Sequence, residues 1–100
     1  ILILFKENIY FNEIDENKLN ELSIIMKKLF TKIYEKDKNC PFNLYLHCHP
    51  LNEENDYKNK YNVHIHIVPR KFNFGGFELS TGMYISSKKS EDIAKKLKFD

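Results

Sequence analysis

The chain has 100 residues, which is enough for one domain with a single core, so we expect one domain spanning residues 1–100. Its 16 Lys and Arg residues and 14 Asp and Glu residues are interspersed and give a net charge of +2, which disfavours a nucleic-acid binder. No window approaches the roughly 20 apolar residues of a membrane span, which disfavours membrane insertion.

The first half of the chain predicts a strand, a long helix and a second strand. Residues 1–5 are consecutive β-favouring apolar residues, which predicts a buried strand. We expect a helix that begins near Glu16, is capped by Asp15 and ends in the charged segment 35–39. Its apolar residues recur at three-and-four spacing, which predicts one packed stripe of Leu19, Leu22, Ile25, Met26, Leu29, Phe30 and Ile33. Residues 42–48 then alternate between apolar and polar side chains, as in a strand.

The second half predicts further strands and a closing helix. Residues 61–68 alternate like a strand that pairs antiparallel with the preceding one, and the polar segment 50–60 connects the two. Residues 79–86 read as one more strand, and Ser90 is expected to cap a short final helix. The order of elements predicts an α+β fold, in which an antiparallel sheet carries one long helix and a short C-terminal helix.

The histidines are the strongest chemical signal in the sequence. His64 and His66 lie on one face of their strand, and His47 lies on the polar face of its neighbour. All four histidines fall on these two strands, which favours a ligand over a surface pair without one. Imidazole nitrogens in such a group can hold a divalent metal, or one of them can attack a phosphate and form a covalent nucleotidyl intermediate. The spacing leaves both chemistries open.

Glu78 and the two cysteines carry weaker signals. Glu78 follows paired glycines, where the backbone permits close approach of a ligand, so its carboxylate is suited to accept hydrogen bonds from sugar hydroxyls. Alternation along the second strand points Cys48 into the core. Without a secretory segment, Cys40 and Cys48 are expected to be reduced thiols.

Several runs of residues carry a resemblance to a known family. They are HIHIVPR at 64–70, GGFELSTGMYI at 75–85 and EDIA at 91–94, preceded by Asn43 and by HCHP at 47–50. These runs resemble the C-terminal half of galactose-1-phosphate uridylyltransferases and the related ADP-glucose phosphorylases, which are members of the histidine-triad superfamily. The resemblance covers most of the chain and implies a histidine-triad-like half-barrel.

The resemblance implies a two-lobed enzyme that transfers a nucleotidyl group between sugar phosphates, such as uridylyl transfer between UDP-glucose and galactose 1-phosphate. Its nucleophilic histidine belongs to a His-Pro-His motif in the N-terminal half. This chain lacks that motif and begins without Met, so we expect a fragment without the covalent chemistry, joined to a missing N-terminal half. The implied substrates are a nucleoside diphosphate hexose and a hexose 1-phosphate. The implied full-length enzyme is a cytoplasmic homodimer.

The resemblance also implies roles for individual residues. Zn or Fe is assigned to three histidines, completed by a glutamate from the other half: His47, His64 and His66. Substrate binding is assigned to four further residues: Glu78, Phe77, Tyr84 and Asn43. Among them, the carboxylate of Glu78 is expected to hold the hexose hydroxyls.

The chain departs from the family pattern at three positions. Asn62 stands where independent histidine-triad proteins have the first histidine of the triad, and Ser86 and Ser90 replace a frequent Asn and Pro. Two alternatives remain open. One is a self-sufficient nucleotidyl hydrolase or transferase that uses His64 as nucleophile. The other is a non-catalytic domain for dimerisation or partner binding.

Overall fold

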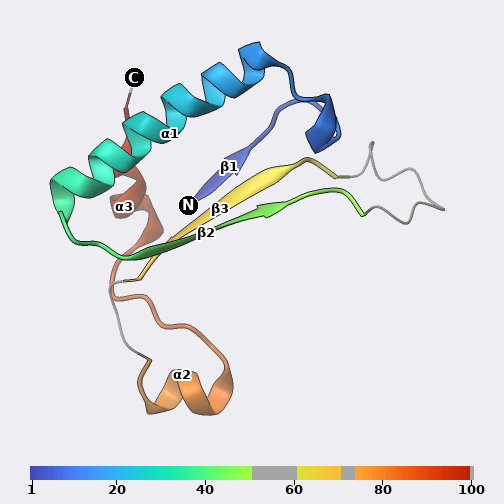
Figure 1. Cartoon of the computed structure of the whole chain (residues 1–100). Helices are drawn as coiled ribbons and strands as arrows, with labels where there is room; N and C mark the ends of the chain where they lie inside the picture. The colour runs from blue at the N-terminus through green and yellow to red at the C-terminus, as the bar shows by residue number, and fades with distance from the viewer. Residues whose placement is uncertain (51–60, 71–73, 100) are drawn as a thin grey trace.

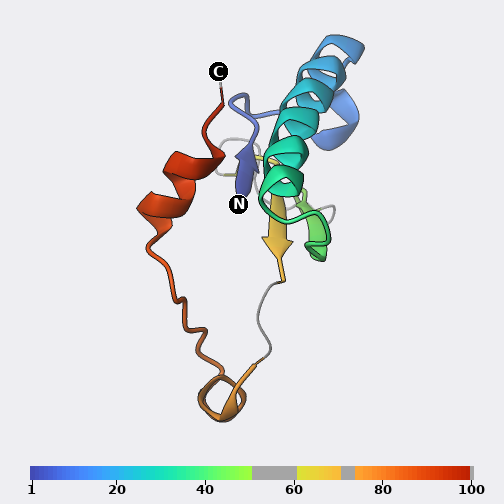
Figure 2. The same ribbon diagram turned by 90° about the vertical axis from the view of Figure 1, so that its left-hand side faces the viewer.

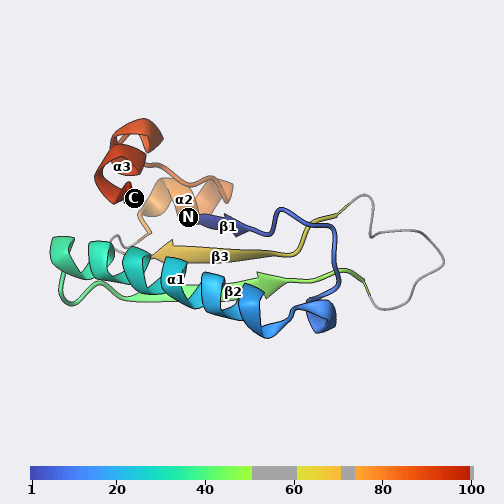
Figure 3. The same cartoon turned by 90° about the horizontal axis from the view of Figure 1, so that it is seen from above.

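The structure is a computed structural model that describes residues 1–50, 61–70 and 74–99. Its elements, in chain order, are β1 (Leu2–Leu4), the 3-10 helix η1 (Phe11–Glu13), α1 (Glu16–Lys36), β2 (Phe42–His47), β3 (His64–Pro69), α2 (Gly76–Thr81) and α3 (Ser90–Leu97). The sheet has three strands. The long helix α1 lies along one of its faces, as Figures 1 and 3 show. The expected α+β class is therefore confirmed, with an open antiparallel sheet.

The sheet has the strand order β1-β3-β2, and both pairs are antiparallel. The strand that carries two histidines, β3, is thus the central one. Its alternate residues Ile65 and Ile67, together with Val63 just before it, are buried in the core. Val63 and Ile67 are completely buried and Ile65 is 6% exposed. Leu29 and Ile33 of α1 pack against Ile65 and Ile67, which fixes the face of the sheet that α1 covers.

Helix α1 forms as its sequence predicts. The Asp15 carboxylate accepts a hydrogen bond from the backbone N–H of Lys18 at 2.9 Å and caps the first turn. The hydrogen bond from Lys18 lowers the pKa of Asp15 below its usual value, since it favours the ionised form. In the apolar stripe, Leu29 and Ile33 are buried, whereas Leu19 remains 47% exposed. The C-terminal half of the stripe therefore contributes most to the core.

The expected strand at residues 79–86 is wrong. Residues Gly76–Thr81 form the helix α2 instead, because local hydrogen bonds close both of its ends. The Glu78 carboxylate accepts from the Gly75 N–H at 3.0 Å, and the Gly82 N–H donates to the Glu78 carbonyl at 2.9 Å. Gly82 adopts a positive φ of 70°, a conformation that glycine adopts at little cost.

The short final helix is confirmed, but the expected capping role of Ser90 is wrong. Ser90 is the first helical residue of α3, Lys89 occupies the capping position, and no side chain caps the helix. Leu97 in the last turn and Phe99 beyond it pack against the core. The charged side chains in the first turn, Glu91 and Asp92, are favourably placed next to the positive end of the helix dipole.

Two expectations about burial are also wrong. The first strand is an edge strand, and Leu2 and Leu4 are each 55% exposed because they face the side of the sheet that α1 leaves uncovered. Cys48 is exposed because β2 ends at His47, one residue before it. Cys40 and Cys48 are both free in the structure.

The expected polar connection at residues 50–60 lies, apart from Pro50, outside the described residues. In the described part of the chain, no helix combines the length and the apolar character needed to cross a bilayer.

Candidate metal centre on the uncovered face of the sheet

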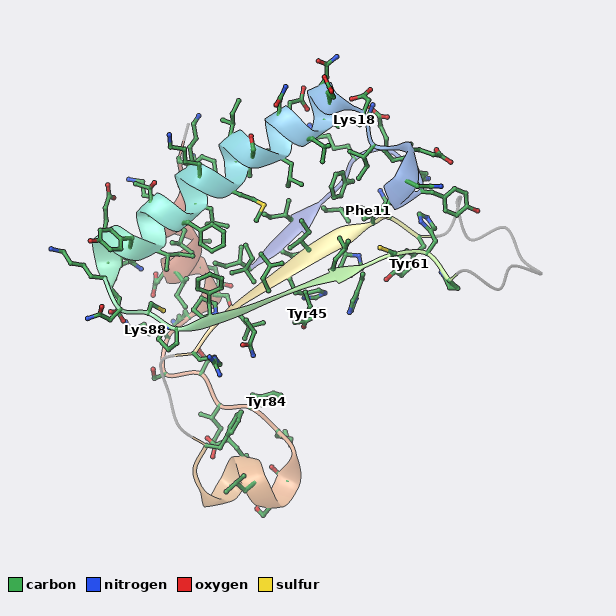
Figure 4. All side chains as sticks on the ribbon, in the orientation of Figure 1. Phe11, Lys18, Tyr45, Tyr61, Tyr84 and Lys88 are labelled. Carbon is green, nitrogen blue, oxygen red and sulfur yellow. The ribbon has the colours of Figure 1, made fainter. Side chains whose placement is uncertain are left out.

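The cross-strand register gathers three histidines on the sheet face opposite α1. His47 pairs with His64, and Tyr45 pairs with His66, across the β2–β3 ladder. Because Ile65 and Ile67 point toward α1, the alternate residues His64 and His66 point the other way. Figure 4 shows Tyr45 projecting from β2 on this side. We call this surface the histidine face.

The three imidazoles lie within contact distance of one another. The ring centroids of His47 are 4.8 Å from those of His64 and His66, and the latter two are 5.0 Å apart. One nitrogen of each ring lies within 4.8 Å of the others. Nitrogens that share a tetrahedral zinc ion at about 2.0–2.1 Å lie about 3.4 Å apart, so separations of up to 4.8 Å would have to shorten before all three nitrogens could bind one ion. Imidazoles are among the preferred ligands of Zn and Fe.

A backbone carbonyl determines which nitrogen of His64 can bind an ion. The His64 Nδ1 atom lies 2.8 Å from the Asn62 carbonyl oxygen. That oxygen only accepts, so Nδ1 carries the proton and Nε2 presents a lone pair. Nε2 is 3.0 Å from His47 Nδ1, which donates to it. To bind an ion through Nδ1, His47 would have to carry its proton on Nε2 instead, while the Asn62 carbonyl would keep the ring of His64 oriented.

The environment of His66 keeps its imidazole neutral. Partial burial lowers the pKa of His66 below its usual value, and the nearby His47 and His64 rings and the N-terminal ammonium lower it further. A neutral imidazole is the form that binds a metal. The Tyr45 ring stacks on His66 with centroids 4.7 Å apart and an angle of 10° between the planes, which restricts rotation of the imidazole.

The fourth histidine does not join this group. His49 follows β2, is 4% exposed and lies between the rings of Tyr10 and Tyr61. The expectation that all four histidines occupy the strand faces is therefore wrong for His49. The cause is that β2 ends at His47, so alternation no longer controls the direction of the side chain.

The structure separates the predicted substrate-binding residues into two groups. Asn43 lies on the histidine face, opposite Val68 in the β2–β3 ladder. Phe77, Glu78 and Tyr84 lie instead in residues 74–85, which we call the arm. Figure 2 shows α2 of the arm set apart from the sheet, and α2 contacts no other helix or strand of the described chain.

The arm leaves its apolar side chains in solvent. Tyr84 is 81% exposed and Phe77 is 49% exposed. Tyr84 contacts Phe74 within the arm, with ring centroids 5.5 Å apart. The Glu78 carboxylate is engaged at the N-terminus of α2. The described residues therefore do not bring Glu78 next to the three histidines.

Sequence reasoning missed the residues that frame the histidines. Tyr45 stacks on His66, and the Tyr61 ring lies 5.4 Å from His64. Alternation along 42–48 places Tyr45 on the polar face with His47, so its role could have been found there. Asn62 appeared only as a departure from the family pattern. Its carbonyl orients His64, and its side chain donates to the Phe5 carbonyl at 2.8 Å.

Comparison with known proteins supports the predicted resemblance. No family model matches the chain, and no solved structure matches it. The chain is 31% identical over 86 residues to ADP-glucose phosphorylase of Arabidopsis thaliana. The match covers 86% of this chain and 24% of that protein, so the chain spans about a quarter of its relative. This similarity confirms the resemblance to the family of uridylyltransferases and ADP-glucose phosphorylases, and it fits a C-terminal fragment of such an enzyme.

Proposed function

We propose that this chain is part of an enzyme that transfers a nucleotidyl group to or from a hexose 1-phosphate, and that it contributes a metal site and a sugar-binding carboxylate. The observation that carries the proposal is the group of three histidines, whose donor nitrogens lie within 4.8 Å of one another on one face of the sheet. The similarity to ADP-glucose phosphorylase supports the class of reaction. The substrates would be a nucleoside diphosphate hexose, such as ADP-glucose or UDP-glucose, and phosphate or a hexose 1-phosphate.

In this proposal His47, His64 and His66 hold Zn or Fe. The donor set fits such an ion, because one imidazole is oriented by the Asn62 carbonyl and another stays neutral near physiological pH. Three imidazoles leave a coordination position for a further ligand, for which we propose a carboxylate from the remainder of the enzyme. The bound ion would supply positive charge to the surface and would link β2 to β3.

We further propose that Glu78 accepts hydrogen bonds from hexose hydroxyls, beside Phe77 and Tyr84, and that Asn43 contacts substrate on the histidine face. The arm and the histidine face are separated in one chain, which supports the expected homodimer. In a dimer, the exposed rings of the arm, including the 81% exposed Tyr84, could pack on a second copy and carry Glu78 to that copy's site. The complete enzyme would be cytoplasmic.

Metal analysis tests the histidine site. The chain should be purified without chelator and its Zn and Fe content measured for the wild type and for the double variant His64→Ala, His66→Ala. We expect stoichiometric metal in the wild type and almost none in the double variant. Tyr84→Ala is the matched control, because it removes an exposed ring from the arm. Equal substoichiometric metal in the wild type and the double variant would refute the site.

Sugar binding is tested by titrating ADP-glucose and UDP-glucose against the wild type and Glu78→Ala. The proposal expects the variant to bind at least about tenfold more weakly, since a charged acceptor would be lost from the sugar site. Glu91→Ala is the control, because it removes an exposed carboxylate from α3. Identical binding by the wild type and Glu78→Ala would favour a domain that serves dimerisation or partner binding.

The second candidate function is a self-sufficient nucleotidyl hydrolase or transferase that uses His64 as nucleophile. It is favoured by one observation, namely that the Asn62 carbonyl holds the proton of His64 on Nδ1. The lone pair is then on Nε2, which would attack once the hydrogen bond from His47 Nδ1 is released. Incubation with a nucleoside diphosphate sugar followed by intact-mass spectrometry distinguishes the two candidates. A nucleotidyl adduct on His64 would support this second function, and we expect none.

A further inference from the structure

His49 is the buried polar residue of the described chain that the proposed function leaves unexplained. It is 4% exposed, and its Nε2 atom lies 2.7 Å from the Tyr61 carbonyl oxygen. Its ring makes edge contacts with Tyr10 at 4.7 Å and with Tyr61 at 5.4 Å between centroids. His49 therefore joins three segments: the end of β2, the residues before η1 and the residues that lead into β3.

The hydrogen bond to Tyr61 fixes the tautomer of His49. A carbonyl oxygen only accepts, so Nε2 carries the proton and Nδ1 is bare. Nδ1 is buried and has no hydrogen-bond partner in the described part of the chain. An unpartnered buried nitrogen is unfavourable, and a leucine would fill the same space without it. The residue therefore calls for an explanation beyond packing.

The atoms that His49 holds are those that support His64. The Tyr61 carbonyl accepts a hydrogen bond from His49. The Tyr61 ring contacts the His64 ring, with centroids 5.4 Å apart. The next residue, Asn62, accepts the His64 Nδ1–H through its own carbonyl at 2.8 Å. The Asn62 side chain also donates to the Phe5 carbonyl at 2.8 Å, which ties the segment to the end of β1. Residues 61 and 62 thus orient His64, and His49 holds this segment in place through its hydrogen bond to the Tyr61 carbonyl.

We propose that His49 is a positioning residue of the metal site, which fixes the peptide segment 61–62 so that His64 presents Nε2 to the ion. This inference rests on the proposed metal-binding function. His49 is not itself a ligand, because the group of donor atoms within 4.8 Å comprises His47, His64 and His66. His49 acts indirectly. Its hydrogen bond to the Tyr61 carbonyl restricts the backbone motion of residues 61 and 62, and His64 is hydrogen-bonded to the Asn62 carbonyl of that segment.

Two substitutions separate positioning from packing. His49→Gln keeps an N–H donor at about the position of Nε2, whereas His49→Phe keeps the ring and loses the donor. The 100-residue chain would be titrated with Co²⁺, and the dissociation constant and the ligand-field absorption spectrum would be recorded. We expect His49→Phe to bind about tenfold more weakly, the lower end of the range for groups that orient metal ligands, with an altered spectrum. His49→Gln should stay close to the wild type.

A matched control removes the effect of stability. Ile33→Val trims the core on the other face of the sheet, where Ile33 is 8% exposed. All variants would be compared at a temperature at which circular dichroism shows each one folded. Ile33→Val should bind Co²⁺ as the wild type does. If it binds as weakly as His49→Phe, the effect of His49 is one of general stability and the inference is overturned.

The outcomes distinguish this inference from the proposed function. If the wild type and His49→Phe bind Co²⁺ equally and His64→Ala does not, the metal site stands and the role of His49 is refuted. If the wild type binds no Co²⁺, the metal site itself fails. Long-range ¹H–¹⁵N spectra of the wild-type imidazoles keep the inference testable should His49→Phe not fold. They should show His49 protonated at Nε2 only, and a proton on Nδ1 instead would overturn it.

Discussion

The histidine face and the arm differ in what determines their conformation. The histidine face is held by the β2–β3 ladder, by the buried side chains of β3 on the opposite side and by a carbonyl behind His64. The arm is held by its own local hydrogen bonds, and α2 contacts no other helix or strand of the described chain. The three histidines are therefore positioned by the packed sheet, whereas the candidate residues of the arm are positioned only by the arm itself.

This contrast explains why the two groups of predicted site residues fare differently. Strand alternation and antiparallel pairing are enough to bring His47, His64 and His66 together, because both act through the backbone. Glu78 has no comparable constraint, since its carboxylate is used within α2 to accept from Gly75. The backbone of the sheet holds the three histidines close together, whereas the side chains of the arm have no contact with another helix or strand of the described chain to position them.

The largest expected effect concerns the core behind the histidine face. Ile67 is completely buried, so Ile67→Ala should lower the free energy of unfolding by about 2–5 kcal/mol through lost burial and the cavity left behind. Leu79 in the arm is 74% exposed, and Leu79→Ala should change it by less than about 0.5 kcal/mol. Urea denaturation of both variants measures the difference. Equal losses would mean that the arm is packed as tightly as the sheet.

A smaller effect should stay within the arm. Gly82 has a φ of 70°, where a side chain costs about 1–2 kcal/mol, so Gly82→Ala should loosen the end of α2. Gly76→Ala is the control, because its added methyl group meets no atom within 4 Å. Amide hydrogen exchange should show reduced protection in residues 79–82 of Gly82→Ala, with the Ile67 amide unchanged. Reduced protection at Ile67 would show that the arm and the sheet unfold together.

The smallest effect is a pH dependence confined to the histidine face. The pKa of His66 is lowered in the folded chain, so the unfolded chain binds a proton more readily. Stability of the metal-free chain should therefore fall as the pH decreases through about 6.5, the usual pKa of histidine, and level off below the folded pKa. His66→Gln should reduce this slope, as measured by thermal unfolding in the presence of chelator. A slope that His66→Gln leaves unchanged would assign the effect to other groups.

How much could be predicted from the sequence depends on whether local or distant interactions decide the structure. The capped helix, the β2–β3 pairing and the burial of Val63, Ile65 and Ile67 follow from periodicity and capping. The strand predicted at 79–86 is wrong. Its apolar and β-favouring residues would form a strand only by pairing with a sheet, and α2 in this segment contacts no strand of the described chain. Its glycines and Glu78 instead close a short helix.

The surroundings of the histidines were harder to predict for a different reason. The position of His49 depends on Tyr10, which is distant in sequence, and on where β2 ends. The support of His64 comes from a backbone carbonyl, which every residue possesses, so no side-chain pattern marks it. Residue types and strand alternation predict which side chains are candidate donors, but the atoms that orient these side chains are found only in the folded chain.

X-ray absorption spectroscopy of the zinc-loaded chain tests the central claim most directly. A centre built from His47, His64 and His66 predicts nitrogen scatterers at about 2.0–2.1 Å, with the outer-shell pattern of three imidazoles and no sulfur. Cys40 and Cys48 are both free thiols and provide the competing ligands. A sulfur scatterer at about 2.3 Å, or a pattern of fewer than three imidazoles, would contradict the account.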